Sequence, residues 1–120
     1  MEKTKLVELM VKITHNRDEI AFSELFDFIA PKLKAYYQQN GLLSENAEEL
    51  TQEVMSLVWV KSEKYDSSKS AVSTWIYTIA RNKKIDFLRK NNDFGVNEED
   101  IREFLYEDNQ KDLVNLNDIK

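Results

Sequence analysis

The chain has 120 residues, a mass of 14.2 kDa and a formal net charge of −5, a size that suits one domain burying roughly two-thirds of its unfolded surface. The absence of cysteine and the single histidine exclude a disulfide framework and a thiolate metal site, so we expect no cofactor and no metal. No apolar run reaches the ~18 residues of a membrane span, and the first residues do not form the uninterrupted apolar stretch expected of a signal peptide. We therefore expect a cytoplasmic protein without membrane contact.

The composition predicts a mainly helical protein, because leucine, glutamate and lysine are abundant and the chain has only two glycines and one proline. Apolar spacing predicts a short leading helix over residues 6–13, with Leu6, Leu9, Met10 and Ile13 inward. A second helix follows Asp18 and stops at Gly41. Pro31 falls inside it, and since proline removes a backbone donor, we expect a kink or a break there. The predicted core stripe of this helix is Phe22, Leu25, Phe26, Ile29, Leu33, Tyr36 and Tyr37.

A third helix is predicted from a cap at Asn46, with Glu49 three residues later, to about Ser62. Its core stripe is Ala47, Leu50, Val54, Leu57 and Val58. The opposite face is acidic and polar, with Glu48, Glu49, Gln52, Glu53 and Ser56. Taken alone, such a face is most simply a solvated helix surface.

A loop rich in serine, lysine and aspartate follows, and Ser70 or Ser73 is the expected N-cap of a fourth helix that extends to Lys90. Trp75, Ile76, Ile79 and Ala80 are predicted to face the core, while Asn82, Asp86 and Arg89 share another stripe. Tyr65, Trp75 and Tyr77 could stack on bases, although the spacing of Trp75 favours the core.

Positive charge is concentrated in this part of the chain. Residues 61–92 hold eight basic and three acidic side chains, a local charge of +5, whereas residues 1–60 carry −4 and residues 93–120 carry −6. A basic segment with interleaved aromatic residues is typical of a surface that binds a polyanion. A solvated charged helix is the simpler alternative.

Residues 1–92 are thus predicted to form an all-α compact bundle of three main helices plus a short leading helix. Residues 93–120 are predicted to be an acidic linker or tail with one short helix near residues 98–106, and we see no second DNA-binding domain there. No Glu-x-x-His pair accompanies the carboxylates, and the predicted role of His15 is that of a surface or helix-end residue. We expect no catalytic residues and no enzyme.

Two separated motifs carry a resemblance to a known family. The sequence EELTQEV, then Trp59, then STWIYTIARNKKIDFLRK resembles region two of bacterial RNA polymerase sigma factors, particularly the extracytoplasmic function (ECF) group of the sigma-70 superfamily. The resemblance covers about residues 18–92. It implies a transcription initiation factor domain that binds core polymerase and recognises and melts the minus-ten promoter element.

The family's binding positions can be carried over to matching residues. The resemblance implies that Glu49, Gln52 and Glu53 meet the clamp coiled coil of the polymerase's largest subunit, with Glu49 replacing the family's aspartate. It also implies that the loop over residues 65–72 captures a flipped base of the non-template strand and that the fourth helix contacts that strand. The implied DNA-binding residues are Tyr65, Lys69, Val72, Ser73, Arg81, Asn82, Lys83, Lys84 and Arg89.

Departures from the family pattern occur in this loop. Val72 stands where the family often has an aromatic residue, Ser73 where it has a basic one, and Ser67 and Ser70 where proline and glycine are common. The promoter sequence is therefore not implied, and neither are the inducing signal or the identity of an anti-sigma partner. The alternatives are a helical adaptor or anti-sigma-type module that does not bind DNA and, less specifically, a generic phosphate-binding helical domain.

Overall fold

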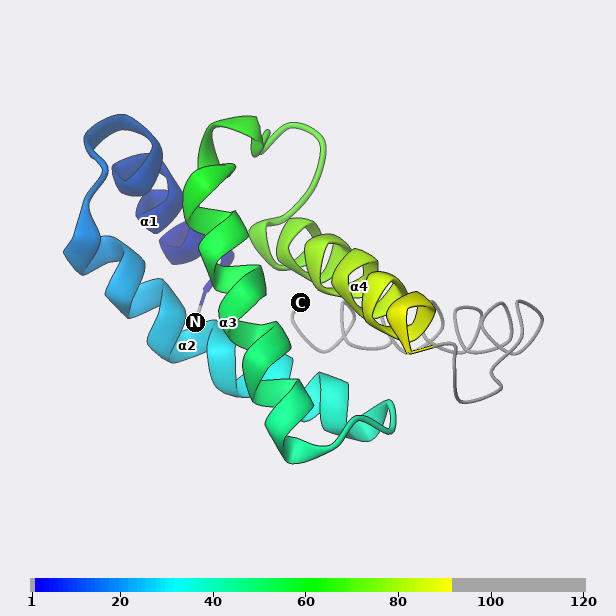
Figure 1. Ribbon diagram of the computed structural model, residues 1–120. Helices are drawn as coiled ribbons and strands as arrows, with labels where there is room; N and C mark the ends of the chain where they lie inside the picture. Colours follow the sequence, from blue (N-terminus) through cyan, green and yellow to red (C-terminus); the bar gives the residue numbers. More distant parts are fainter. Residues whose placement is uncertain (1, 92–120) are drawn as a thin grey trace.

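The computed structural model describes residues 2–91, and within them the chain forms four α-helices and no strand. The elements are α1 (Lys3–Asn16), α2 (Glu19–Gln39), α3 (Ser44–Val60), the short 3-10 helix η1 (Ser62–Lys64) and α4 (Val72–Lys90). Figure 1 shows α3 lying between α2 and α4, with α1 beside α2 and the loop from η1 to α4 at one end. The predicted all-α bundle is confirmed.

The core forms where the apolar stripes of the helices meet. All four predicted residues of α1 are buried, and they share one hydrophobic cluster with Leu25, Ile29 and Leu33 of α2 and with Val54 and Val58 of α3. In α4, Ile76 and Ala80 are fully buried, whereas Trp75 and Ile79 are only partly buried against the core. A side-chain hydrogen bond also joins two helices, because Tyr37 Oη donates to the Ala80 carbonyl at 2.7 Å.

Asp18 and Gly41 delimit α2. The Asp18 carboxylate accepts the Ala21 N–H at 3.0 Å and so caps the helix start. Gly41 has φ +92° directly after the C-cap Asn40, which confirms the predicted stop. The helix is continuous through Pro31, so no break occurs there. Pro31 and Asp27, whose carbonyl loses its donor, are both exposed, and solvent can replace the missing hydrogen bond.

The predicted caps of the last two helices are wrong. Helix α3 begins at Ser44, two residues before Asn46, and helix α4 begins at Val72 after Ala71. Neither start has a side-chain cap hydrogen bond. Ser70 instead accepts a hydrogen bond through its carbonyl from Tyr65 Oη at 2.9 Å, and Ser73 is buried in the first turn of α4. Packing of the apolar stripes therefore decides where these helices begin. The predicted short helix near residues 98–106 lies outside the described residues.

Candidate functional site

An acidic face runs along α3. We define it as Glu49, Gln52 and Glu53, three exposed residues whose spacing places them on one side of the helix. Neighbouring Glu48 is bound to Lys34 of α2, with 2.8 Å between Nζ and Oε2. Glu53 pairs with Lys83 of α4, whereas Glu49 forms no salt bridge with any residue that the structure describes. Within residues 2–91, the acidic face therefore presents at least one carboxylate without a cationic partner.

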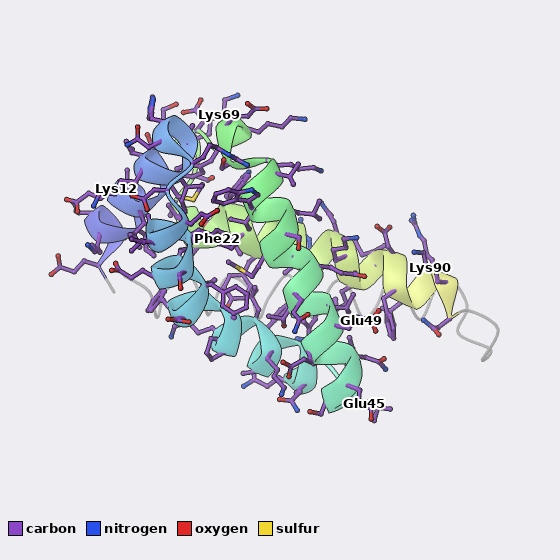
Figure 2. All side chains as sticks on the ribbon, turned by 60° about the vertical axis from the view of Figure 1, so that its left-hand side comes forward. Lys12, Phe22, Glu45, Glu49, Lys69 and Lys90 are labelled. Atoms are coloured by element: carbon purple, nitrogen blue, oxygen red, sulfur yellow. The ribbon has the colours of Figure 1, made fainter. Side chains whose placement is uncertain are left out.

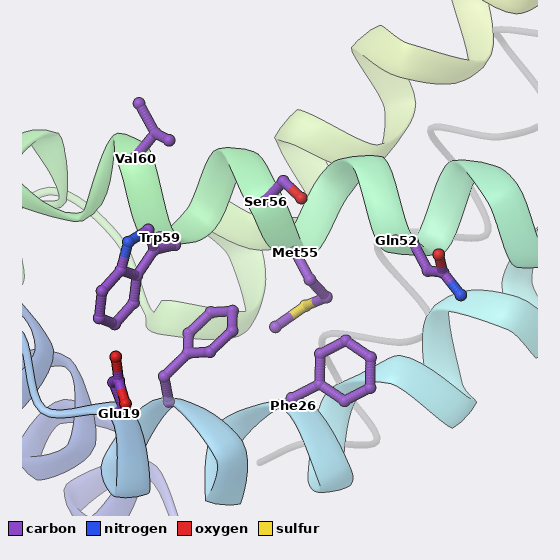
Figure 3. Close-up of a pocket in the computed structure, with 8 residues that line it drawn as sticks. Glu19, Phe26, Gln52, Met55, Ser56, Trp59 and Val60 are labelled. Carbon is purple, nitrogen blue, oxygen red and sulfur yellow. The ribbon is translucent and has the colours of Figure 1, made fainter.

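An apolar groove lies beside the acidic face, between the first half of α2 and the second half of α3. It measures about 770 Å³, and Figure 3 shows Phe26, Met55 and Trp59 directed into it. The remaining lining residues are Glu19, Phe22, Gln52, Ser56 and Val60. Gln52 belongs to both surfaces, so the groove and the acidic face are continuous.

The groove corrects one part of the predicted core. Phe22 and Phe26 were expected in the core stripe of α2, but both are only partly buried. The Phe22 ring meets Trp59 edge to face, with 5.1 Å between ring centroids and 69° between planes. Val60 adds an apolar surface that is 62% exposed. Sequence analysis missed the groove, although α2 carries more aromatic residues than a narrow core stripe requires.

Arg17 fixes the end of α3 that carries Trp59. Its Nη1 donates to the Trp59 carbonyl at 2.9 Å and to Ser62 Oγ at 3.1 Å. Its guanidinium carbon lies 4.1 Å from the centroid of the Trp59 ring, a cation–π distance. Arg17 itself sits in the left-handed region, with φ 49°, in the turn between α1 and α2. The turn thus anchors one wall of the groove.

The loop before α4 is organised by Asp66. Its Oδ1 accepts hydrogen bonds from the backbone N–H of Ser68 at 2.9 Å and from Ser68 Oγ at 2.6 Å. The backbone N–H of Lys69 donates to the Asp66 carbonyl at 3.0 Å. The Ser68 hydrogen bonds hold the pKa of the Asp66 carboxyl below its usual value. Lys69 is exposed, as a phosphate contact requires.

We expect Ser68→Ala to raise the pKa of Asp66 toward that of a free aspartate, because one of the two donors to Oδ1 is removed. A carboxyl whose folded pKa is depressed stabilises the fold above its unfolded pKa, and this contribution is lost as pH falls through the folded pKa. Titration of the carboxyl carbon by NMR in both proteins measures the change. An unaltered Asp66 pKa would show that the backbone N–H alone holds the carboxylate.

Tyr65 closes the same loop. Its ring lies against Trp75, with 5.6 Å between centroids, and both residues are partly buried. Burial, followed by the charge of Asp66, raises the pKa of the Tyr65 phenol. Both aromatic side chains keep some exposed surface, so each remains available for stacking.

Helix α4 presents part of the predicted basic surface. Asn82, Asp86 and Arg89 are exposed along one stripe, as the spacing predicted, while Arg81 and Lys83 are partly exposed. These side chains project from the same helix as the partly exposed Trp75, and the loop carrying Lys69 precedes its first turn. Of the predicted DNA-binding residues, six keep exposed surface on the loop and along α4: Tyr65, Lys69, Arg81, Asn82, Lys83 and Arg89.

Three predicted DNA-contacting side chains are corrected. Lys84 is fully buried, and Val72 and Ser73 are each 2% exposed, so none of them can contact a strand in this conformation. Val72 and Ser73 both lie in the buried first turn of α4. Tyr77, which could have stacked on a base, is 8% exposed and meets the Tyr36 ring edge to face at 5.3 Å.

Lys84 links α4 to α2 in the interior. Its Nζ donates to Tyr36 Oη at 3.1 Å and lies 5.0 Å from the centroid of the Tyr36 ring. A buried ammonium requires such partners, because leaving a charge unsolvated is costly. Lys84 therefore positions the helix that carries the basic surface.

Other classes of site receive no support from the described residues. Residues 2–91 contain no group of three or more His, Asp or Glu side chains that could hold a metal ion. None of the described helices is long and apolar enough to cross a membrane. His15 is exposed in the last turn of α1, which confirms its predicted place.

Comparison with known families shows which family the chain belongs to. The profile of Sigma-70 region 2 matches residues 28–94, which include most of α2 and all of α3 and α4. The chain belongs to the sigma-70 region 2 family. The ECF resemblance is confirmed as well, because the chain is 48% identical over 89 residues to the ECF RNA polymerase sigma factor RpoE of Cereibacter sphaeroides.

More distant relatives and a solved structure agree. The ECF RNA polymerase sigma factor SigW of Bacillus subtilis is 30% identical to this chain over 86 residues. The crystal structure of Rhodobacter sphaeroides SigE in complex with the anti-sigma ChrR matches it with a TM-score of 0.70 at 48% identity, covering 75% of this chain and 55% of that one. The matches cover 74% and 71% of this chain but only 49% of RpoE and 45% of SigW, so the chain spans about half the length of these relatives.

Proposed function

We propose that the chain is a transcription initiation factor domain that binds core RNA polymerase and recognises and melts the minus-ten promoter element. The observation that carries the proposal is the pairing, in one region 2 domain, of an acidic face on α3 with a basic, aromatic-flanked surface on α4. We assign residues 1–92 to this unit and residues 93–120 to an acidic linker or tail. In this role the chain acts by binding and is not an enzyme.

The acidic face is the proposed contact with the clamp coiled coil of the polymerase's largest subunit. Glu49, Gln52 and Glu53 can pair with basic and amide groups, and complementary charge speeds and orients such an encounter. The adjoining groove supplies apolar area through Phe22, Phe26 and Trp59, which an interface needs for affinity. Together they form one surface with an apolar centre and a polar edge.

The loop and α4 are the proposed contact with the non-template strand. Lys69, Lys83 and Arg89 can neutralise phosphates, which positions the strand but specifies no sequence. Opening a duplex costs a few kcal/mol per unstacked step, and stacking of an exposed base on an aromatic side chain can offset this cost. We assign stacking to Tyr65 and Trp75, and reading of the unpaired base to the loop and Asn82.

The alternative is a helical adaptor or anti-sigma-type module that does not bind DNA. The two functions differ in one measurement, because salt-sensitive binding to single-stranded minus-ten DNA is expected only of the first. We also propose an anti-sigma partner, since the matched SigE was solved in complex with the anti-sigma ChrR. If the chain binds polymerase but does not bind single-stranded minus-ten DNA even at low salt, the adaptor function is favoured.

Arg89→Ala and Asn82→Ala should have different effects on DNA binding. Arg89→Ala should weaken binding to all strands alike and reduce the slope of log affinity against log salt by about 0.7, the value for one phosphate contact on a single strand. Asn82→Ala should instead change the ranking of minus-ten sequences. Affinities of both variants for a panel of oligonucleotides, measured over a salt series in the presence of polymerase, test this division. A sequence-selective loss in Arg89→Ala would assign that side chain to base reading.

A further inference from the structure

A small cleft separates α3 from α4 and brings together charges from the two proposed binding surfaces. It measures about 140 Å³ and is lined by three carboxylates, Glu49, Glu53 and Asp86, and by two ammonium groups, Lys83 and Lys90. Figure 2 shows the half of α3 that carries Glu49 running beside the half of α4 that ends at Lys90. Part of the acidic face therefore lies across from cations of α4.

One ion pair spans this cleft. Lys83 Nζ lies 3.7 Å from Glu53 Oε2, and the two side chains are 31% and 45% exposed. The pair is therefore accessible to solvent and to a binding partner. An exposed pair contributes at most about 1 kcal/mol, equivalent to about a fivefold change in an equilibrium constant. Such a contact is strong enough to bias a binding equilibrium and weak enough to be exchanged.

The two members of the pair belong to different surfaces of the proposed function. Glu53 lies on the acidic face assigned to polymerase, and Lys83 lies on the helix assigned to DNA. A phosphate that approaches Lys83 must compete with the Glu53 carboxylate, and a cationic partner that approaches Glu53 must compete with Lys83. Occupation of one surface therefore changes the charge that is available at the other.

We propose that the Glu53–Lys83 ion pair couples the two surfaces. In the free chain the pair keeps Lys83 from binding DNA, and Lys83 is released when a cationic group of polymerase engages Glu53. The proposal rests on the proposed function, because it needs both partners. Coupling of this kind is reciprocal, so DNA that takes Lys83 strengthens polymerase binding by the same factor. Because an exposed ion pair contributes at most about 1 kcal/mol, this factor is at most about fivefold.

A charge-matched set of variants of the full chain tests the coupling without polymerase. Glu53→Gln should raise the affinity for a fluorescent single-stranded minus-ten oligonucleotide about two- to fivefold at low salt, because it frees Lys83. Glu45→Gln is the control, since it removes the same charge from α3 but neither lines the cleft nor pairs with Lys83. When Lys83 is already replaced by Gln, Glu53→Gln should raise the affinity for the oligonucleotide no more than Glu45→Gln does.

Core polymerase supplies the second arm of the experiment. At saturating polymerase, the extra gain of Glu53→Gln over Glu45→Gln should disappear, because Glu53 is already engaged by its partner. Equal gains from the two variants in the free chain, or a gain that persists in the Lys83→Gln background, would overturn the coupling while leaving the proposed function intact. A full chain that binds no single strand with or without polymerase would overturn the DNA-binding role and the coupling together.

Discussion

Glu49→Lys is expected to weaken binding to core RNA polymerase by about tenfold or more while leaving the melting temperature nearly unchanged. Charge reversal removes one attraction to a basic partner and adds one repulsion, each on the order of 1 kcal/mol at a partly desolvated interface. Glu49 is exposed and forms no salt bridge with the described residues, so the fold loses little. A binding titration with purified core enzyme and thermal unfolding by circular dichroism measure the two quantities.

Glu49 is a better probe of this surface than Glu53. Reversal of Glu53 would place two ammonium groups beside each other, because its carboxylate lies 3.7 Å from Lys83 Nζ. The matched control is Glu45→Lys, which makes the same change in net charge one turn earlier on α3, outside the acidic face. Polymerase binding that is equal in the Glu49 and Glu45 variants would remove the acidic face from the interface.

The adjacent lysines of α4 should respond to alanine in opposite ways. We expect Lys84→Ala to lower the free energy of unfolding by about 2–4 kcal/mol, because it leaves a cavity and removes the donor to Tyr36 Oη. Lys83→Ala should cost no more than about 1 kcal/mol, since its salt bridge is exposed to solvent. Urea unfolding followed by circular dichroism gives both values.

A third variant distinguishes the effect of the volume of Lys84 on stability from the effect of its charge. Lys84→Met keeps an unbranched side chain of similar length, and replacing a buried charge by a hydrophobic residue of similar volume is often neutral or stabilising. It should therefore retain more stability than Lys84→Ala. If Lys84→Ala cost no more than Lys83→Ala, the buried position of Lys84 would be contradicted. If Lys84→Ala instead weakened DNA binding at full stability, the phosphate contact first expected of it would return.

Much of the fold follows from local patterns in the sequence. The spacing of Leu6, Leu9, Met10 and Ile13 predicted a buried stripe, and the structure buries all four. Gly41 ends α2 because glycine adopts a positive φ without a steric penalty. The exposed stripe of α4 also follows from helical periodicity, which depends on the chain alone. The two motifs on α3 and α4 similarly predicted a family that the comparisons confirm.

The neighbouring lysines 83 and 84 show what the sequence left open. They are chemically identical, and both could belong to a basic surface. Consecutive residues on a helix point about 100° apart, so only the way α4 packs against α2 decides that Lys84 meets Tyr36 while Lys83 reaches Glu53.

The caps and the groove depend on the same long-range contacts. Asn46 and Ser73 have good capping side chains, but contacts between helices place the helix starts elsewhere, because burial of a whole apolar stripe outweighs the ~1 kcal/mol of a cap. Phe22 and Phe26 fit a core stripe by spacing, yet they line an open groove between α2 and α3. Local periodicity thus determined the helices and their inner faces. Only the packing of the four described helices decided which of the remaining charged and aromatic side chains stay exposed.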